Sequence, residues 1–355
     1  MSEIRAAVIG VGSMGANHAR VYAEMEGVRL VALADVDPGR LRAVTRGKDR
    51  TLRAYEDYRE LLTTEKLDLL SIAVPTRLHR EAATAAIERG VATLVEKPLT
   101  PSVEDGRPLI EAARATGVPL MVGHVERFNP AVQELKRRLD AGALGRVLQV
   151  QARRVGPFPQ RIRDVGVVQD LAAHDIDIMR YLLGSEVERV FAETQRQVST
   201  EHEDLVSAVL RFRDGAVGML DVNWLTPTKV RQLTVLGERG MFALDYLTQE
   251  LRFYARPATD ASWPPDRGRM AAWGWSAALT GAGEGAMERI AIEKVEPLRA
   301  ELEALAAWVR GGPGTACPMP PEDALAALEV AERIVEAGRT GQVVPVGERV
   351  ADRGD

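Results

Sequence analysis

The sequence predicts an α/β protein of two domains, with a doubly wound parallel sheet in the first and an open, mainly antiparallel sheet in a second α/β domain. The chain has 355 residues, a length that suits two average domains. Its first 123 residues alternate short apolar runs with amphipathic stretches, and later strand-like runs follow one another with few helices between them. We therefore expect domains over residues 1–123 and 124–355.

Continuous apolar runs in the first part predict strands that are covered on both faces, as in a parallel sheet. These runs are Ile4–Ile9, Val28–Ala34, Leu67–Val74, Val91–Val95 and Leu120–Val122. Stretches with helical periodicity lie between them, at Ala16–Met25, Arg80–Arg89 and Val103–Ala115.

After Gly123 the pattern changes to successive strand-like runs that are separated by turn signals. Strands are expected at Arg146–Arg154, Glu188–Gln197, Leu205–Phe212, Ala216–Asn223, Val230–Leu236 and Leu251–Tyr254. Helices are expected at Pro130–Ala141, Gln169–Leu183, Pro297–Arg310 and Glu322–Ala337. The segment Ala258–Met287, rich in Gly, Trp, Ala and Pro, predicts a long loop.

The composition excludes several classes of protein as first choices. A net charge of -5 argues against binding to nucleic acid or to an anionic membrane surface. No run approaches the ~20 apolar residues of a membrane span, and the first residues do not resemble a signal peptide. The single cysteine, Cys317, allows no intrachain disulfide, which fits a cytoplasmic protein, and we expect no metal site.

A glycine-rich turn with the Gly-x-Gly-x-x-Gly spacing follows the first predicted strand and opens the first predicted helix. Gly10 permits the tight turn, Gly12 lets the backbone approach a pyrophosphate, and Gly15 allows the helix to pack closely on the strand. Ser13 and Met14 lie at the helix N-terminus, whose free N–H groups can face the phosphates. The first domain is therefore predicted to be a Rossmann domain that binds a dinucleotide.

Asp35 ends the second apolar run, 20 residues after Gly15. A carboxylate at this place accepts hydrogen bonds from the ribose hydroxyls and repels a 2′-phosphate. We therefore expect NAD as the cofactor rather than NADP.

Polar residues also follow two further apolar runs, where ligands of doubly wound sheets bind. One run leads into Glu96 and Lys97, and the other into Val74, Pro75, Thr76 and His79. We expect these residues to contact the cofactor, with Lys97 next to the nicotinamide. An ammonium there can bind a substrate hydroxyl and stabilise the alkoxide that develops as hydride leaves.

Asp170 and His174 are four residues apart in a predicted helix and therefore share one face. Histidine is the side chain best suited to proton exchange near neutral pH. Asp170 could bind substrate hydroxyls or orient the imidazole. The pattern thus predicts a second group of chemical residues, and it leaves open whether Lys97 or His174 is the base.

Together these residues resemble the Gfo/Idh/MocA oxidoreductases, and the resemblance extends over nearly the whole chain. It implies NAD(P)-dependent dehydrogenase activity on CH–OH groups of sugars, cyclitols or their derivatives. It also implies catalytic positions at Lys97, Asp170 and His174 and a cis Lys97–Pro98 bond. The chain departs from the pattern near Gly166, where many members have a glycine-rich run.

Three further strings are similar to the nucleotide-sugar branch, in particular to UDP-N-acetylglucosamine 3-dehydrogenases: 123–130, 222–231 and 296–301. This implies oxidation of the sugar C3 hydroxyl to a ketone. The pyrophosphate of a UDP-sugar needs cations, for which the candidates are Arg127, Arg154, Arg161, Lys229 and Arg231. Glu126 and Asn129 could bind hydroxyl or amide groups.

Other activities stay open on the sequence alone. The chain could act on an inositol or a free sugar, run as a ketoreductase, recycle bound NAD as a lyase or epimerase, or serve as a non-catalytic NAD-binding regulator. Apolar positions such as Val206, Ala208 and Leu210 alternate along the later strands. Because an open sheet must cover its second face, we expect a homodimer or homotetramer through the second domain.

Overall fold

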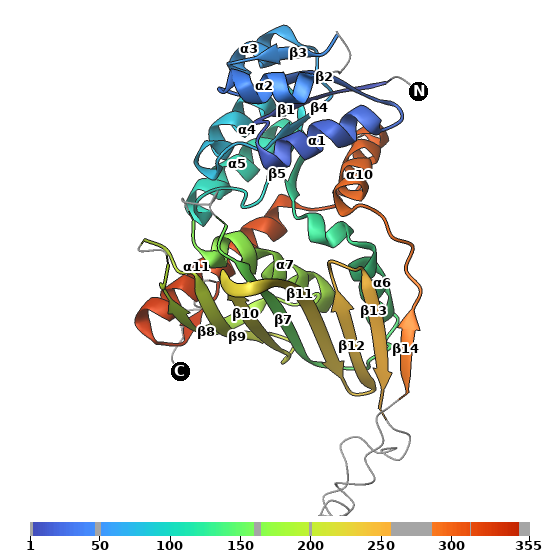
Figure 1. The fold of residues 1–355 in the computed structure, drawn as a ribbon, viewed down its shortest axis with the longest axis vertical. Coiled ribbons are helices and arrows are strands. Elements are labelled where there is room, and N and C mark those ends of the chain that lie inside the picture. Colours follow the sequence, from blue (N-terminus) through green and yellow to red (C-terminus); the bar gives the residue numbers. More distant parts are fainter. Residues whose placement is uncertain are drawn as a thin grey trace, which may run out of the picture. The chain divides into compact units, whose positions relative to one another are not determined.

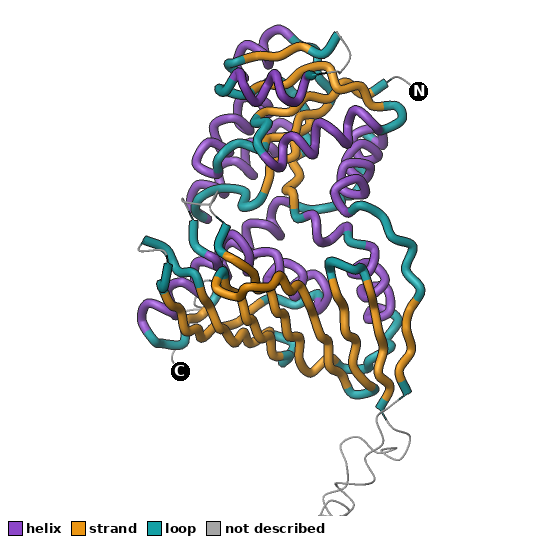
Figure 2. Tube along the Cα trace, in the orientation of Figure 1, coloured by secondary structure: helices purple, strands orange, loops and turns teal. Residues whose placement is uncertain are grey.

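The computed structural model describes residues 3–46, 51–159, 165–198, 201–256, 286–312 and 314–347. The chain divides into two compact units. The first combines residues 1–128 with 295–332, and the second combines 129–294 with 333–355. Helices and strands alternate along the first unit, whereas strands lie side by side in the second (Figure 2). Within the described ranges, no helix is long and apolar enough to cross a membrane.

The first unit contains a six-stranded, wholly parallel sheet with the strand order β3-β2-β1-β4-β5-β6. The strands are β1 (Ile4–Ile9), β2 (Val28–Ala34), β3 (Arg53–Tyr55), β4 (Leu69–Ile72), β5 (Ala92–Glu96) and β6 (Leu120–Gly123). This order reverses between β1 and β4, which is the place where a Rossmann sheet binds its dinucleotide. The predicted doubly wound sheet is therefore confirmed.

Helices cover both faces of this sheet, with α1 and α10 on one side and α4 and α5 on the other (Figure 1). They are α1 (Ser13–Glu24), α2 (Pro38–Thr45), α3 (Tyr58–Thr64), α4 (His79–Ile87), α5 (Val103–Thr116) and α10 (Pro297–Gly311). Short polar residues start three of them, because the side chains of Asp37, Asp57 and Ser102 accept hydrogen bonds from backbone N–H groups of the first turn.

The return of residues 295–332 to the first unit differs from the expected boundary, which placed everything after residue 123 in the second domain. Leu302, Leu305 and Ala306 of α10 have no exposed surface and belong to the core of the parallel sheet. Arg299 also forms an ion pair with Glu24 of α1 at 2.6 Å. The sequence between residues 124 and 294 separates these partners, so local patterns do not indicate the contact.

The second unit is built on a nine-stranded sheet with the order β14-β13-β12-β11-β7-β10-β9-β8-β15. Its strands are β7 (Val147–Pro157), β8 (Val187–Gln195), β9 (Leu205–Phe212), β10 (Val217–Asn223), β11 (Leu225–Gly237), β12 (Gly240–Asp245), β13 (Glu250–Ala255), β14 (Met287–Ile290) and β15 (Val344–Pro345). Every pairing is antiparallel except that of β10 with β7. The predicted mainly antiparallel sheet is thus confirmed.

Two helices of the second unit, α6 (Pro130–Asp140) and α7 (Ala173–Leu183), contact strands of this sheet. Helix α11 (Pro321–Thr340) crosses from the first unit into the second at residue 332. Along β9, Val206, Ala208 and Leu210 are buried, whereas Val209 between them is 44% exposed. One face of the sheet therefore carries the core, and the opposite face remains accessible within this chain. Most of the predicted loop 258–287 lies outside the described residues.

Candidate active site

The glycine turn after β1 has the backbone that the sequence predicts. Gly10 has φ +83°, and a Cβ atom on it would lie 2.6 Å from the carbonyl oxygen of Ala73. A Cβ atom on Gly15 would lie 1.7 Å from the oxygen of Gly10, so helix α1 can approach the strand only with glycine here. By contrast, the nearest atom to a Cβ on Gly12 is 3.9 Å away, on the side chain of Arg40. Gly12 therefore faces open space.

Helix α1 begins next to this opening without a side-chain cap on its Gly12 N-cap. The N–H groups of its first turn, at Ser13 and Met14, are therefore available to an anion. A helix N-terminus without a side-chain cap, beside an unobstructed glycine, fits the pyrophosphate of a dinucleotide.

Asp35 closes the other side of the turn. Its carboxylate accepts hydrogen bonds from the N–H groups of Val11 at 2.8 Å and of Asp37 at 2.9 Å. A guanidinium nitrogen of Arg40 lies 3.9 Å from the same carboxylate. A cavity of about 550 Å³ adjoins these groups, lined by Gly10, Gly12, Asp35, Val74 and Pro75 among others. This volume lies in the range typical of small-molecule sites.

The segment after β4 connects the cavity to the next strand end. Val74 and Pro75 line the cavity, and Thr76 opens a short 3-10 turn, Thr76–Leu78. His79 is 1% exposed, and its ring nitrogens lie 2.9 Å from the carbonyl oxygens of Val74 and Pro98. Burial lowers the pKa of His79. His79 therefore connects the segments that follow β4 and β5, and its buried ring offers little surface to a cofactor.

Glu96 is the last residue of β5 and Lys97 follows it, so both lie at the same carboxyl edge of the sheet as the glycine turn. The Lys97–Pro98 bond is cis, as the resemblance implied. Glu96 is buried: one carboxylate oxygen lies 2.9 Å from Nε2 of His18, and the other accepts the Lys97 N–H at 3.3 Å. Burial opposes ionisation of Glu96, but the hydrogen bond from His18 and the nearby charges of His18, Lys97 and His79 outweigh it and lower the pKa of Glu96.

Glu301 of α10 is a second buried carboxyl group near Glu96. It has no exposed surface, and neither of its carboxyl oxygens has a hydrogen-bond partner among the described residues. Burial, reinforced by the charge of Glu96, raises the pKa of Glu301 well above its ordinary value. Glu301 therefore keeps its proton to a higher pH than an exposed glutamate does.

This raised pKa makes the stability of the protein depend on pH. Because the folded chain binds the Glu301 proton more tightly than the unfolded chain, the contribution of Glu301 to stability is most favourable below the ordinary glutamate pKa and becomes less favourable as pH rises towards the raised value. We expect Glu301→Gln, which cannot ionise, to remove a slope of about 1.4 kcal/mol per pH unit in this window. Urea unfolding at several pH values measures it, with Glu303→Gln, an exposed position on the same helix, as the control. A variant whose advantage over the natural protein does not grow with pH would contradict this expectation.

In the second unit, Asp170 lies in a π-helical turn, Val168–Ala172, and His174 lies in the first turn of α7. The sequence predicted a regular α-helix here, but π turns of this kind often occur at functional sites. Glu203 supports the turn, since its carboxylate accepts the N–H of Val168 at 3.2 Å. A Cβ atom on Gly166 would lie 2.0 Å from the same carboxylate. Asp170 and His174 are both half-buried, so each retains some accessible surface.

Several residues that were expected to bind substrate have partners within the protein. Arg127 pairs with Asp323 at 2.8 Å, and Arg231 donates to the carbonyl oxygen of Val155 at 2.7 Å. Asn129 is the N-cap of α6 and donates to the Tyr246 carbonyl oxygen at 3.2 Å.

Two other candidates keep accessible surface. Lys229 on β11 is exposed, and Glu126 is half-buried. Arg161 lies outside the described residues. Among the expected cations that the described ranges include, Lys229 is therefore the one best placed to meet a ligand from solvent.

Arg154 is held in the core of the second unit. Its guanidinium forms two hydrogen bonds with Asp175, of 2.7 and 3.0 Å, and lies 4.9 Å from the ring centre of Tyr246. The two charged side chains are 4% and 1% exposed. This geometry is that of a structural ion pair, which the sequence-based assignment of Arg154 to the substrate did not foresee.

We expect Asp175→Ala to destabilise the protein by about 3–5 kcal/mol, because it removes a buried carboxylate that forms two hydrogen bonds with the buried Arg154 charge. Asp221→Ala is a matched control, since it removes the partner of the neighbouring Arg153 from a pair that is 53% and 43% exposed. The control should cost about 1 kcal/mol or less. Denaturant unfolding measures both, and equal losses would show that burial does not set the contribution of the Arg154 pair.

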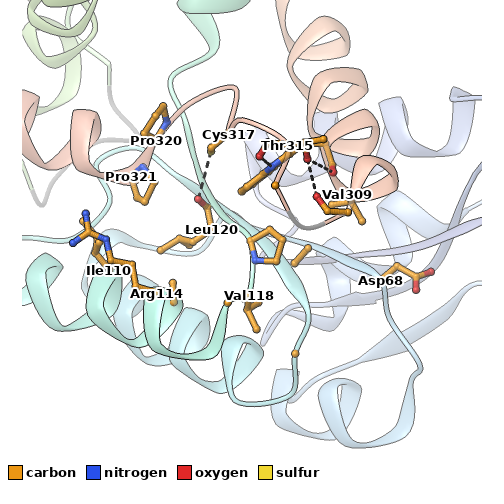
Figure 3. Close-up of a pocket in the computed structure, with 18 of the residues that line it drawn as sticks. Asp68, Ile110, Arg114, Val118, Leu120, Val309, Thr315, Cys317, Pro320 and Pro321 are labelled. Atoms are coloured by element: carbon orange, nitrogen blue, oxygen red, sulfur yellow. Dashed lines mark hydrogen bonds between the residues drawn. The ribbon is translucent and has the colours of Figure 1, made fainter.

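A second cavity of about 550 Å³ lies at the amino ends of β4, β5 and β6 (Figure 3). Ile110, Leu120, Val309 and Cys317 line it. None of the predicted site residues lines this cavity, because the predicted site residues of the first unit lie at the carboxyl ends of the strands. Burial raises the pKa of Cys317 to about 11, so the thiol stays protonated near neutral pH. Within the described residues, no group of His, Cys, Asp and Glu is arranged to hold a metal ion.

Known proteins match this chain over both units. An NAD-binding Rossmann-fold oxidoreductase family matches residues 4–124, and the GFO/IDH/MocA C-terminal domain matches residues 132–243. The UDP-N-acetylglucosamine 3-dehydrogenase of Acidithiobacillus ferrooxidans is 31% identical over 259 residues, which are 73% of this chain and 79% of that protein. The scyllo-inositol 2-dehydrogenase (NAD(+)) of Bacillus subtilis is 32% identical over 235 residues, 63% of this chain and 68% of that protein.

Solved structures agree with these matches. The structure of the Acidithiobacillus ferrooxidans UDP-N-acetylglucosamine 3-dehydrogenase superposes with a TM-score of 0.80 at 26% identity, covering 95% of this chain and 98% of that one. The family expected from the Glu96-Lys97-Pro98 and Asp170/His174 strings is confirmed. The chain belongs to the Gfo/Idh/MocA family of NAD-binding oxidoreductases and is a dehydrogenase.

Proposed function

We propose that this dehydrogenase oxidises a sugar hydroxyl to a ketone, at C3 of a UDP-N-acetylhexosamine, with NAD rather than NADP as the acceptor. The observation that carries the proposal is the position of Lys97, which follows β5 at the carboxyl edge where the glycine turn and Asp35 lie. NAD, when bound, takes up the hydride. The preference for NAD follows from the Asp35 carboxylate, which would repel a 2′-phosphate.

The protein residues position the substrate and handle its proton. Lys97 donates a hydrogen bond to the reacting hydroxyl and stabilises the negative charge that develops on that oxygen. His174 or Lys97 removes the hydroxyl proton, and Asp170 binds a neighbouring hydroxyl or orients the imidazole. Lys229 and Glu126 are the substrate contacts that keep accessible surface. An attraction between Lys229 and the substrate pyrophosphate would account for the choice of a nucleotide-sugar.

A substrate panel tests this proposal directly. NADH absorbance is followed with NAD or NADP and with UDP-N-acetylglucosamine, free N-acetylglucosamine, scyllo-inositol or myo-inositol. We expect turnover with the UDP-sugar and NAD. Turnover with an inositol alone would favour the second candidate, an inositol dehydrogenase, which the 32% identity to the Bacillus subtilis enzyme supports. A preference for NADP would overturn the role given to Asp35.

We further propose that the chain forms a homodimer or homotetramer through the outer face of the nine-stranded sheet. Phe191 is 37% and Val209 is 44% exposed on adjacent strands of this face. Apolar surface of this kind is usually covered in an assembly. Light scattering measures the mass in solution, and a monomeric natural protein would refute the proposal.

A further inference from the structure

A network of buried polar side chains in the first unit ends at Glu96, the residue before Lys97. Nε2 of His18 lies 2.9 Å from Glu96, and Nδ1 of the same ring lies 3.1 Å from the hydroxyl of Ser71. The Ser71 hydroxyl lies 2.7 Å from that of Tyr22. His18, Ser71 and Tyr22 have no exposed surface. This network joins α1, β4 and β5, and the proposed mechanism gives no role to His18, Ser71 or Tyr22.

The ionised carboxylate fixes the first hydrogen bond of this network. Ionised Glu96 can only accept, so Nε2 of His18 carries a hydrogen. The Ser71 hydroxyl, which can both donate and accept, connects Nδ1 of the same ring to the Tyr22 hydroxyl. Burial raises the pKa of Tyr22, so its hydroxyl keeps its hydrogen near neutral pH. Each of these groups therefore has a hydrogen-bond partner in the network that ends at Glu96.

The hydrogen-bonded network ends inside the core, because Tyr22 is not exposed to solvent. The network therefore offers no path for a proton to reach solvent through Tyr22. Its effect is to fix the Glu96 carboxylate, which His18 holds on one oxygen and the Lys97 N–H on the other. Gly123 leaves room for it, since a Cβ atom there would lie 3.2 Å from the carboxyl group.

We propose that Tyr22, Ser71 and His18 are positioning residues that hold the Glu96 carboxylate, and through it the main chain of Lys97, in the geometry that hydride transfer requires. The proposal rests on the proposed function in one respect, the role of Lys97 in the reaction. Small displacements of a reacting group cost on the order of 100-fold in rate, which makes kcat the sensitive measurement.

Ser71→Ala breaks the chain at its centre. Thr93→Val is the matched control, since Thr93 is also a fully buried hydroxyl, on β5, and donates to the Val91 carbonyl oxygen at 2.9 Å, away from Glu96. We expect Ser71→Ala to lower kcat by roughly 10- to 100-fold with little change in KM, and Thr93→Val to lower the melting temperature by a similar amount without lowering kcat. Tyr22→Phe combined with Ser71→Ala should lower kcat no further than Ser71→Ala alone. Equal kcat in the Ser71→Ala and Thr93→Val variants would overturn the proposal.

A second measurement does not depend on the substrate. The ring nitrogens of His18 are observed by NMR in protein labelled with ¹⁵N-histidine and are assigned by their loss in His18→Gln, one of only five histidines in the chain. We expect hydrogen on Nε2, the ring nitrogen that faces Glu96. A ring with hydrogen on Nδ1 alone would overturn the proposal, because His18 could then not donate to the Glu96 carboxylate. If no sugar in the panel gives NADH, the proposed function fails, and this spectrum still tests the hydrogen bond on which the positioning of Glu96 depends.

Discussion

Lys97→Met should lower kcat by about 10²- to 10⁴-fold while the affinity for NAD changes little. Methionine keeps the length and apolar contacts of the side chain but removes the ammonium that stabilises the developing alkoxide. Loss of one such electrostatic contact, or of one general acid or base, typically costs this much. Lys66→Met, at an exposed position in the same unit, is the control and should retain the natural rate.

The comparison with His174→Asn then identifies the base. If Lys97 is the base, Lys97→Met loses the acidic limb of the pH–kcat profile, where kcat rises as the base gives up its proton, whereas His174→Asn keeps this limb. If His174 is the base, His174→Asn loses the acidic limb and Lys97→Met keeps it. Near-natural turnover in both variants would refute the catalytic roles given to these residues.

Gly12→Ala should weaken NAD binding by roughly 10- to 100-fold and leave the fold intact. A Cβ atom on Gly12 has no protein atom closer than 3.9 Å, so alanine fits the ligand-free chain. It would occupy the space through which the backbone approaches the pyrophosphate, and a steric conflict of this size costs about 1–3 kcal/mol. Fluorescence titration with NADH measures the affinity, and thermal unfolding measures the stability.

Gly15→Ala supplies the contrast within the same turn. Its Cβ atom would lie 1.7 Å from the Gly10 oxygen, so α1 must move away from β1. We expect loss of stability together with loss of binding. If Gly12→Ala bound NADH with natural affinity, the dinucleotide would not lie against Gly12.

The sequence predicted those features that depend on local patterns. Lys97 could be placed at a strand end because an apolar run precedes it directly, and Gly10 because its spacing to Gly12 and Gly15 follows from the turn itself. The edge strand β3 was missed, since it has three residues and two are exposed. An edge strand needs no continuous apolar run.

The partners of charged residues were not predictable in this way. Arg127 was expected to bind substrate, yet its partner Asp323 is 196 residues away in the sequence. Arg154 and Arg231 likewise find their partners through the tertiary fold. The sequence does not predict a role for His18, because nothing in its neighbourhood along the chain shows that Ser71 and Glu96 contact it. A single charged residue in a sequence therefore predicts that the residue has a partner, but it does not predict which residue or ligand that partner is.

The discontinuous first unit has a consequence for how the protein is made. Residues 1–128 leave the ribosome early, but Leu302 and Leu305 of α10, which complete one layer of their core, are synthesised after the entire nine-stranded sheet except its last short strand. During translation the nascent parallel sheet keeps an uncovered apolar face while about 170 further residues are added, which takes roughly 8 to 35 seconds at about 5–20 residues per second. The cofactor-binding half, although it is encoded first, is therefore completed late, and in this interval its exposed face is open to chaperones and to aggregation.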